Sequence, residues 1–290
     1  MKIINLIENT EGHSGCVHSH GLSFYIETKK HKLLLDLGPS AATIHNAETL
    51  GIDLSKVDTV ILSHGHYDHS GGIIPFAGVN DKAVIYMQES AVGDFYANDE
   101  EDEERPGQYR YIGIDKNIAK LPQVRFLWGD IKIDDEIELF TIKSRTHKLP
   151  FPNAHLLVCE EKENNINKRI YRRDDFIHEQ FLVIRQNGKS ILLSGCAHNG
   201  ILSILDAYCE KYGEAPDMVV SGFHLMKDTP YDDNEILEIE DIADKLKDYP
   251  TKFVTCHCTS VPAYELMKRI MGDKLEYVHS GEEINTECIS

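Results

Sequence analysis

The sequence predicts an α/β protein in which two strand-rich halves form sheets that pack face to face, with helices outside. Short apolar and β-branched runs alternate with stretches of helical periodicity, which is typical of layered α/β architecture. Four of these runs lead directly into loops that contain histidine. No long repeat or low-complexity linker divides the chain, so we expect residues 1–290 to form a single domain.

Composition narrows the class of partner. The formal net charge of −18 opposes binding to the phosphate backbone of a nucleic acid. No stretch reaches the roughly 20 apolar residues that cross a bilayer, and the first residues lack the apolar region of a signal peptide. Seven cysteines without a framework spacing indicate reduced thiols. We therefore expect a cytoplasmic protein that binds a small-molecule substrate, with neither a nucleic-acid nor a membrane partner. The sequence carries no signal for an oligomeric state.

The first half of the chain begins with strands. Residues 1–8 predict a first strand, residues 21–27 alternate apolar side chains at period two, and residues 32–35 form a continuous buried run. Residues 41–52 place apolar side chains at helical spacing. The β-branched and apolar run 57–62 predicts a further buried strand.

The loop after this last strand, residues 63–72, contains three imidazoles and one carboxylate within six positions. They are His64, His66, Asp68 and His69. Imidazole nitrogens and carboxylate oxygens are the usual ligands of zinc and similar divalent ions. One tetrahedral ion cannot easily take all four from so short a loop and keep a position open for substrate, whereas two neighbouring ions can. The alternative is a histidine-rich surface loop that binds metal only by chance, but the specific spacing behind a strand argues against it.

Weaker patterns follow this loop. Residues 73–77 predict a helix or turn, residues 82–87 a strand, and residues 124–142 short strands around a Gly-Asp turn. The acidic run 98–107 predicts a solvated loop. The alternative is a mobile flap over the cleft, with apolar contacts from residues just beyond it, Tyr109, Tyr111 and Ile112.

Residues 143–175 are mostly polar, and we expect an irregular excursion near the mouth of the site. This stretch gathers basic residues within an acidic protein: Arg145, Lys148, Lys168, Arg169, Arg172 and Arg173. One interpretation is an anion-binding rim for a phosphorylated substrate. The other is charge balance on the surface.

The second half repeats the alternation of strands and helices. Two apolar runs joined by Gln186-Asn187-Gly188 predict a hairpin over residues 179–193. Helices are predicted over residues 201–212, 234–246 and 261–271, and strands over residues 217–220 and 252–255.

Three strands of this half are each followed closely by a histidine: His198, His224 and His257. Any one of them could be a core or capping residue. Because ligands collect beyond the carboxyl ends of strands in α/β layers, the recurrence predicts one cluster together with the loop 63–72. The loop between the first strands holds three more histidines, His13, His18 and His20. These form either a rim of the cleft or a polar turn.

The pattern His64-x-His66-x-Asp68-His69 resembles the metal motif of the metallo-β-lactamase fold superfamily. Asp36-Leu37-Gly38 is similar to that superfamily's early Asp-x-Gly element, and residues 21–27 resemble the hairpin before it. Further similar motifs are Ser194–Gly200, Ser221–Leu225 and Thr255–Thr259. Together they resemble one branch, the metal-dependent hydrolases related to 7,8-dihydropterin-6-methyl-4-(β-D-ribofuranosyl)aminobenzene 5′-phosphate synthase. The resemblance spans residues 1–284 and implies an αββα sandwich of two mixed β-sheets with helices outside.

The resemblance also implies two sets of metal ligands. They are His64, His66 and His198 for one ion, and Asp68, His69 and His257 for the other. A water or hydroxide between the ions would attack the substrate, and Asp68 would hold it or accept its proton. Asp36 would orient a metal-bound imidazole from behind. Zinc is the expected ion, with manganese or iron as alternatives.

One strand departs from the superfamily's pattern. Many members end it in Gly-Asp, whose carboxylate bridges the ions, whereas this chain has Gly195-Cys196, with His198 two residues on. The early loop that supplies a further histidine in those members offers only Thr146-His147-Lys148. Either His198 or Cys196 takes the remaining ligand position, or one site is incomplete; we favour His198.

His224 is expected to face the substrate, because six ligands are assigned without it. It would donate a hydrogen bond to a developing oxyanion or a proton to the leaving group, so His224 and Asp68 are the candidate catalytic residues. Cys256 and Cys258 flank His257 and would share the opposite face of a strand, which predicts core thiols.

The leading hypothesis is a metal-dependent hydrolase that directs a metal-activated water or hydroxide at a small metabolite carrying a phosphate or an ester. The branch implies a second hypothesis, a pterin-related ribofuranosylaminobenzene 5′-phosphate synthase that condenses two molecules. A redox or sensing metalloprotein is a third hypothesis, and a metal-binding protein without catalysis is a fourth. The redox hypothesis is weakened because the chain lacks an obvious fused flavin domain and the extra carboxylate ligands of iron-containing relatives.

Overall fold

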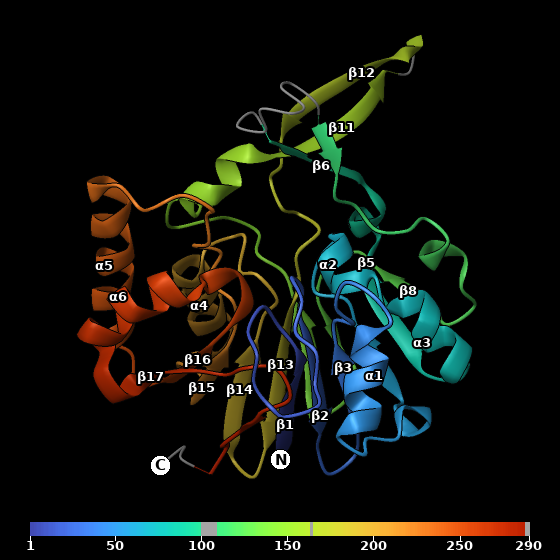
Figure 1. The fold of residues 1–290 in the computed structure, drawn as a ribbon, viewed down its shortest axis with the longest axis horizontal. Coiled ribbons are helices and arrows are strands. Elements are labelled where there is room, and N and C mark those ends of the chain that lie inside the picture. Colours follow the sequence, from blue (N-terminus) through green and yellow to red (C-terminus); the bar gives the residue numbers. More distant parts are fainter. Residues whose placement is uncertain (100–108, 163–164, 288–290) are drawn as a thin grey trace.

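Two mixed β-sheets lie face to face in the structure, a computed structural model that describes residues 1–99, 109–162 and 165–287 (Figure 1). The first sheet has the strand order β18-β1-β2-β3-β4-β5-β8. Its strands are β1 (Lys2–Ile7), β2 (Ser23–Glu27), β3 (Lys32–Leu35), β4 (Thr59–Ile61), β5 (Val84–Gln88), β8 (Val124–Leu127) and β18 (Glu283–Ile284). Because β3, β4, β5 and β8 run parallel, their carboxyl ends share one edge of the sheet.

The second sheet has the strand order β17-β16-β15-β14-β13-β10-β9. Its strands are β9 (Ile131–Lys132), β10 (Ile137–Phe140), β13 (Phe181–Gln186), β14 (Lys189–Leu193), β15 (Met218–Val220), β16 (Lys252–Thr255) and β17 (Leu275–Tyr277). Strands β14 to β17 are parallel. The predicted hairpin is confirmed: β13 and β14 join at Asn187 and Gly188, which have φ angles of 58° and 75°. Positive φ at both positions suits the tight turn that Asn-Gly favours.

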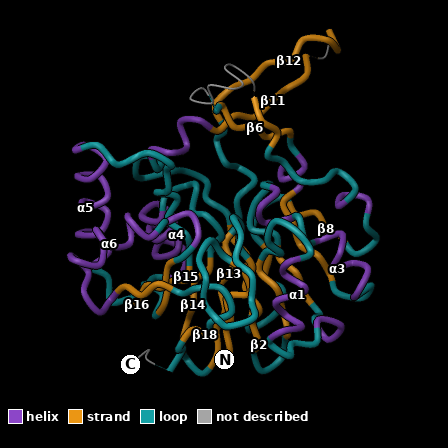
Figure 2. The backbone as a smooth tube through the Cα atoms, viewed as in Figure 1, coloured by secondary structure: helices purple, strands orange, loops and turns teal. Residues whose placement is uncertain are grey.

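Helices cover the outer faces of the two sheets (Figure 2). The α-helices are α1 (Ala42–Thr49), α2 (Tyr67–Ser70), α3 (Ile73–Val79), α4 (Ile201–Tyr212), α5 (Asp233–Lys247) and α6 (Val261–Met271). Short 3-10 helices are Leu54–Lys56, Glu89–Val92, Ile118–Lys120, Phe151–His155, His257–Thr259 and Gly272–Lys274. The predicted helices are all present. Helix α5 begins with a capping box in which Asp232 and Glu235 each accept from the other's backbone N–H.

Apolar side chains fill three layers. Between the sheets, side chains of β2, β3 and β4 meet side chains of β13, β14 and β15. Within β4, Ile61 points into this central layer, whereas Val60 points outward to the layer under α1 and α3. The third layer packs α4, α5 and α6 on the second sheet. The structure is therefore the expected αββα sandwich.

A third sheet corrects the prediction that residues 143–175 are irregular. Strands β11 (Leu156–Lys162) and β12 (Asn165–Arg173) join β6 (Asp94–Asn98) and β7 (Tyr109–Tyr111) in the order β12-β11-β6-β7. This sheet projects from the sandwich beyond α2 (Figure 1). Its apolar cluster is small, built on the buried residues Phe95, Ala97 and Ile112. Strands that bury so little need no apolar alternation, which is why their polar sequence did not predict them.

The acidic run 98–107 lies mostly outside the described residues, and the flap stays a prediction there. Three residues are expected to give this flap its apolar contacts. Tyr109 and Tyr111 are exposed on β7, while Ile112 is buried. Within residues 1–99, 109–162 and 165–287, no helix has the length and apolar character that a membrane span needs.

Candidate metal centre

The candidate site lies where carboxyl ends of strands from both sheets meet. In the first sheet, Asp36 follows β3 and the loop 63–72 follows β4. In the second sheet, the register pairs Leu193 with Val220, and Val220 with Val254. The carboxyl ends of β14, β15 and β16 are therefore aligned, and the loops that follow these strands start side by side. These loops carry Cys196, His198, His224 and His257. The topology thus brings all the predicted site residues to one edge of the sandwich.

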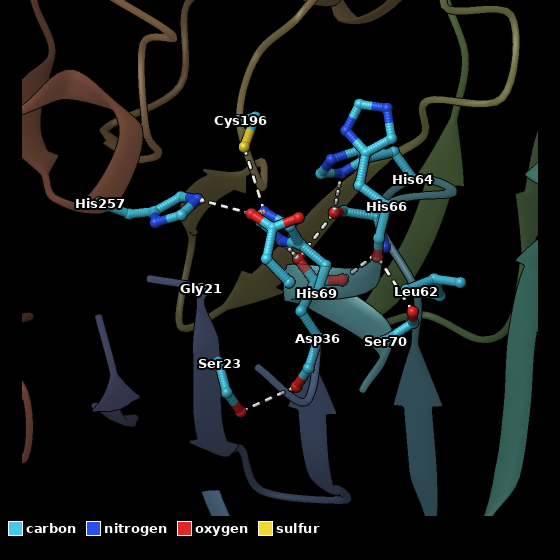
Figure 3. A network of polar contacts seen from close by, with 12 residues as sticks. Gly21, Ser23, Asp36, Leu62, His64, His66, His69, Ser70, Cys196 and His257 are labelled. Carbon is cyan, nitrogen blue, oxygen red and sulfur yellow. Dashed lines mark hydrogen bonds and ion pairs between the residues drawn. The ribbon is translucent and has the colours of Figure 1, made fainter. Parts of the chain in front are cut away.

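Asp36 organises the start of the metal loop. This fully buried carboxylate accepts hydrogen bonds from the backbone N–H of Ser63 at 2.7 Å and from its hydroxyl at 2.6 Å. Its Oδ2 atom also accepts from Nδ1 of His69 at 2.6 Å (Figure 3). Because the one hydroxyl proton of Ser63 goes to Asp36, the Ser63 oxygen accepts from Nδ1 of His64, 2.8 Å away. The Nδ1 protons of both histidines are thus fixed, and their Nε2 atoms face inward.

Two asparagines hold the other histidines in the same way. The Oδ1 atom of Asn153 lies 2.9 Å from Nδ1 of His198, and its amide N–H donates to the backbone oxygen of the same residue at 2.7 Å. The Oδ1 atom of Asn9 lies 2.7 Å from Nδ1 of His257. An amide oxygen can only accept, so both rings carry their proton on Nδ1. Sequence reasoning missed both asparagines.

The Nε2 atoms of His64 and His198 lie 3.2 Å apart. With both ring protons on Nδ1, two lone pairs face each other with no proton between them. A zinc ion with Zn–N bonds of about 2.0–2.1 Å in tetrahedral geometry separates two ligand nitrogens by roughly 3.3–3.4 Å. The pair therefore fits a shared cation. His66 joins it: its ring centroid lies 4.8 Å from that of His198, and its buried Nε2 atom has no hydrogen-bond partner among the described residues.

Asp68 lies on the other side of the cluster. Its Oδ2 atom is 3.5 Å from Nε2 of His69 and 3.4 Å from Nε2 of His257. Nε2 of His20 is also 3.4 Å away, so the first loop reaches the cluster through this residue. His13 and His18 on the same loop are exposed. The structure thus brings together the predicted second set and adds His20 beside it.

Burial and neighbouring charges set the protonation of these groups. Burial lowers the pKa of His66 to about 3, and burial together with neighbouring histidines holds the pKa of His64 and His198 well below the ordinary value. Burial acts to lower the pKa of His69 too, but Asp36 and Asp68 raise it to about 9. Asp68 keeps a pKa well below the ordinary value because nearby histidines outweigh its burial. The site therefore holds neutral imidazoles at His64, His66 and His198 and an ionised carboxylate at Asp68, the states that bind metal, whereas His69 would release a proton on binding.

Cys196, Cys258 and His224 lie beside the histidines. Their ligand atoms are within 4.8 Å of one another, and Cys196 is also in reach of the other histidines. Burial raises the pKa of the Cys196 thiol. The prediction for Cys256 is consistent with its place in the central core layer, whereas Cys258 turns to the site. The reason is the 3-10 turn His257–Thr259, which breaks the strand alternation on which the prediction depended.

Backbone strain collects at this edge. Asp36, Ala197, His224 and His257 have φ angles of 61°, 55°, 49° and 49°, which side chains with a Cβ rarely adopt. A glycine permits the close approach of the two sheets: a Cβ on Gly195 would lie 2.3 Å from the Ser63 hydroxyl oxygen. Strain of this kind persists where the surrounding contacts over-determine the conformation.

Two further buried residues support the loops and were missed from the sequence. Glu179 accepts from the backbone N–H groups of His198 and Asn199, at 2.8 and 2.9 Å. His178 accepts from the N–H of Gly65 at 3.0 Å, and its other ring nitrogen contacts Asp174 at 3.0 Å. The only signal was an acid and a histidine at the start of a predicted strand, where solvent exposure was the ordinary expectation.

The remaining sequence candidates lie elsewhere or are already paired. Nε2 of His147 contacts Asp206 at 3.2 Å rather than the cluster. Of the basic residues, Arg145 donates to Oδ1 of Asn199 at 2.9 Å, next to His198, whereas Arg172 pairs with Glu160 at 2.8 Å on the third sheet. Arg169 and Arg173 also belong to β12. Arg169, Arg172 and Arg173 therefore lie on the third sheet, whereas Arg145 contacts a loop of the site.

Comparisons with known proteins give a consistent picture. A family model described as the metallo-β-lactamase superfamily matches residues 18–166. The chain is 29% identical over 305 residues to a protein of Methanocaldococcus jannaschii named 7,8-dihydropterin-6-methyl-4-(β-D-ribofuranosyl)-aminobenzene-5′-phosphate synthase, covering 98% of this chain and 96% of the relative. It is 27% identical to an uncharacterised protein of the same organism over 286 residues, 96% of this chain and 98% of that one. A crystal structure of a metal-dependent hydrolase of the β-lactamase superfamily has a TM-score of 0.78 at 28% identity, with 99% of each chain covered.

Proposed function

Because the chain belongs to the metallo-β-lactamase superfamily, we propose that it is a hydrolase with two divalent ions, acting on a small metabolite that carries a phosphate or an ester. The observation that carries the proposal is the pair of inward-facing lone pairs on His64 and His198, whose Nε2 atoms lie 3.2 Å apart. A positive charge between them relieves that contact. The surrounding nitrogen, oxygen and sulfur donors favour zinc, with manganese or iron as alternatives.

Each site residue has a role that its contacts support. The proposed ligands are His64, His66 and His198 for one ion, and Asp68, His69 and His257 for the other. Bound ions supply a water of lowered pKa, from about 16 towards about 7, and polarise the bond to be cleaved. Asp68 is ionised, so its carboxylate can hold that water by a hydrogen bond. Asp36 holds His69 in place from behind, through its 2.6 Å contact with Nδ1.

His224 supplies the proton chemistry. Both of its ring nitrogens are buried yet have no hydrogen-bond partner among the described residues. Its ring centroid lies 4.1 Å from that of His198, so it stands next to the cluster. We assign it a proton donation to the leaving group, or a hydrogen bond to the oxyanion.

Arg145 supports a phosphate on the substrate. It donates to the backbone oxygen of Asp175 at 2.7 Å and to Asn199 at 2.9 Å, both through the same nitrogen, Nη1. These two bonds leave other guanidinium N–H groups for an anion beside the His198 loop. We propose that the substrate is a small molecule and that the protein acts in the cytoplasm.

A second candidate is a condensing enzyme of the synthase type. The observation that favours it is the relative of that name, which aligns over 98% of this chain. A synthase joins two molecules with loss of a leaving group, whereas a hydrolase transfers the same centre to water. The two candidates therefore share a metal centre and differ in the acceptor.

The test combines metal content with turnover. We expect about two ions per chain in the wild type, and a loss of one or both in His198→Ala, because that ring supplies one of the facing nitrogens. His147→Ala is the matched control, since His147 contacts Asp206 away from the cluster. The wild type should hydrolyse members of a phosphomonoester, phosphodiester, ester and lactam panel. One ion or none in the wild type, unchanged in His198→Ala, would contradict the ligand assignment. Two ions without hydrolysis, but with condensation of a phosphorylated donor and an aromatic amine, would favour the synthase.

A further inference from the structure

One thiol lies within ligand reach of both halves of the histidine cluster. The Sγ atom of Cys196 lies within 4.8 Å of ligand nitrogens of His64 and His198. It lies within the same 4.8 Å of ligand nitrogens of His69 and His257, and its distance to Nε2 of His69 is 3.1 Å. Cys196 is the only residue that these two groups share. Figure 3 shows its side chain pointing at His69, with His257 to the side.

The backbone holds this thiol between the two halves. Cys196 follows β14 and is 3% exposed. Gly195 before it packs against Ser63 and Asp36, and Ala197 after it has a φ angle of 55°. The direction of the Cys196 side chain is therefore set by a strained turn whose two flanking residues are both held in place.

The groups around the thiol point to a ligand rather than to a packed core. His257 is fully buried, and its Nε2 atom has no hydrogen-bond partner among the described residues apart from the 3.4 Å ion-pair contact with Oδ2 of Asp68. The neighbouring thiol of Cys258 donates to the backbone oxygen of Cys196 at 3.5 Å, so it has a partner of its own. Cys258 reaches only His224 among the site histidines, whereas Cys196 reaches histidines of both proposed ligand sets.

We propose that the thiolate of Cys196 is a ligand shared by both ions, in addition to His198 and not in place of it. The inference rests on the metal centre proposed above. On binding, the ions take the place of the thiol proton, which passes to solvent. The thiolate adds a third negative charge to those of Asp36 and Asp68, which reduces the uncompensated charge of two divalent ions in a buried site.

A shared thiolate also sets the choice of ion. Sulfur is a soft donor, so the site prefers zinc, cobalt(II) or cadmium over manganese or magnesium. A centre bridged by oxygen donors alone would not discriminate in this way. The inference therefore deepens the proposed function by naming the metals that it uses.

The test is a titration of metal-free protein with cobalt(II), followed by near-ultraviolet absorption. A thiolate bound to cobalt(II) produces a charge-transfer band, and a shared thiolate makes the band grow through both the first and the second equivalent. The band should be absent from Cys196→Ser. It should persist in Cys258→Ser, whose thiol lies beside the site, and in Cys209→Ser, whose thiol lies on α4. Cys196→Asp should still bind two ions, without the band, because a carboxylate can also bridge.

Three results would overturn the inference in protein that binds cobalt. The band could stop growing after one equivalent, which makes the thiolate a ligand of a single ion. It could survive in Cys196→Ser, or it could be absent from the wild type while two cobalt ions bind. That last result leaves the proposed function standing, whereas a wild type that binds no cobalt rejects both. If Cys196→Ser does not fold, the wild-type titration alone decides between one equivalent and two.

Discussion

His224 differs from four neighbouring histidines in that no side chain among the described residues fixes its ring. His64, His69, His198 and His257 are each held at Nδ1, by a hydroxyl, a carboxylate or an amide oxygen. His224 has neither nitrogen engaged within the described part of the chain, although the atoms are buried. A metal ligand needs one fixed orientation, whereas a group that exchanges protons with a substrate needs a nitrogen that the substrate can reach.

We expect His224→Gln to lower kcat by about 100-fold or more, because positioned acid–base catalysis contributes roughly that factor. Metal content should stay at the wild-type value, since the six proposed ligands do not include this residue. The measurement is turnover on the best substrate of the panel together with metal analysis. His147→Gln is the matched control and should retain both. Loss of an ion in His224→Gln would show that this histidine is a ligand instead.

The site residues divide into those that the sequence predicts and those that it does not. The histidines and Asp68 are predictable because metal chemistry restricts both their type and their spacing behind strands. Asn9 and Asn153 carry no such signal: they are ordinary loop residues whose partners lie 248 and 45 positions away in the chain. An orienting residue needs only one well-placed oxygen, so neither its type nor its position is restricted locally.

Burial also decides which strands and helices can be predicted from the sequence. The strands of the sandwich are predictable because each buries apolar side chains on one or both faces. Strands β11 and β12 are not, because their sheet projects from the body and its charges pair across the surface, as Arg172 and Glu160 do at 2.8 Å. Helix α4 shows the opposite case. Its apolar spacing identifies the face that packs on the sheet, and the left-handed Gly213, with a φ angle of 77°, marks where the helix ends.

His31 joins the two sheets at the end opposite the site. Its Nδ1 atom lies 2.8 Å from Asp58, just before β4, and its Nε2 atom lies 3.0 Å from Asp134, between β9 and β10. Burial acts to lower the pKa of His31, but hydrogen bonds to these two carboxylates raise it above the ordinary value. A raised folded-state pKa means that protonation stabilises the fold. This contribution is complete below the unfolded-state pKa of about 6.5 and is lost as the pH rises through the folded-state value.

We therefore expect His31→Gln to reduce the free energy of unfolding by about 0.5–1 kcal/mol near pH 6, an amount limited by the partial exposure of the pair with Asp58. The difference from the wild type should shrink as the pH rises to about 9. Denaturant unfolding at several pH values measures it. His45→Gln, on the exposed face of α1, is the control and should show no such trend. A difference that grows with pH would contradict the raised pKa.

The whole molecule carries a net charge of −18, yet a phosphorylated substrate, one of the two proposed classes, is an anion. Such a charge raises the local concentration of cations and repels phosphates in the surrounding solvent. The two proposed divalent ions would reverse the sign of the field locally, at the edge where the strands of both sheets end. Metal binding is therefore expected to organise the fold and the substrate site together, because the ligands come from both sheets.

Removal of the ions tests this coupling between sheets. A ligand present at 100 times its dissociation constant stabilises a protein by about 2.7 kcal/mol. For a chain of this size that corresponds to a fall in Tm of roughly 4–5 °C for each ion lost on chelation. Scanning calorimetry of metal-free and reloaded protein measures the change, and zinc in excess of the chelator should restore the original Tm. His198→Ala should show a smaller difference, because it has fewer ions to lose. Equal Tm values with and without metal, in protein shown by analysis to bind two ions, would mean that the sheets come together without them.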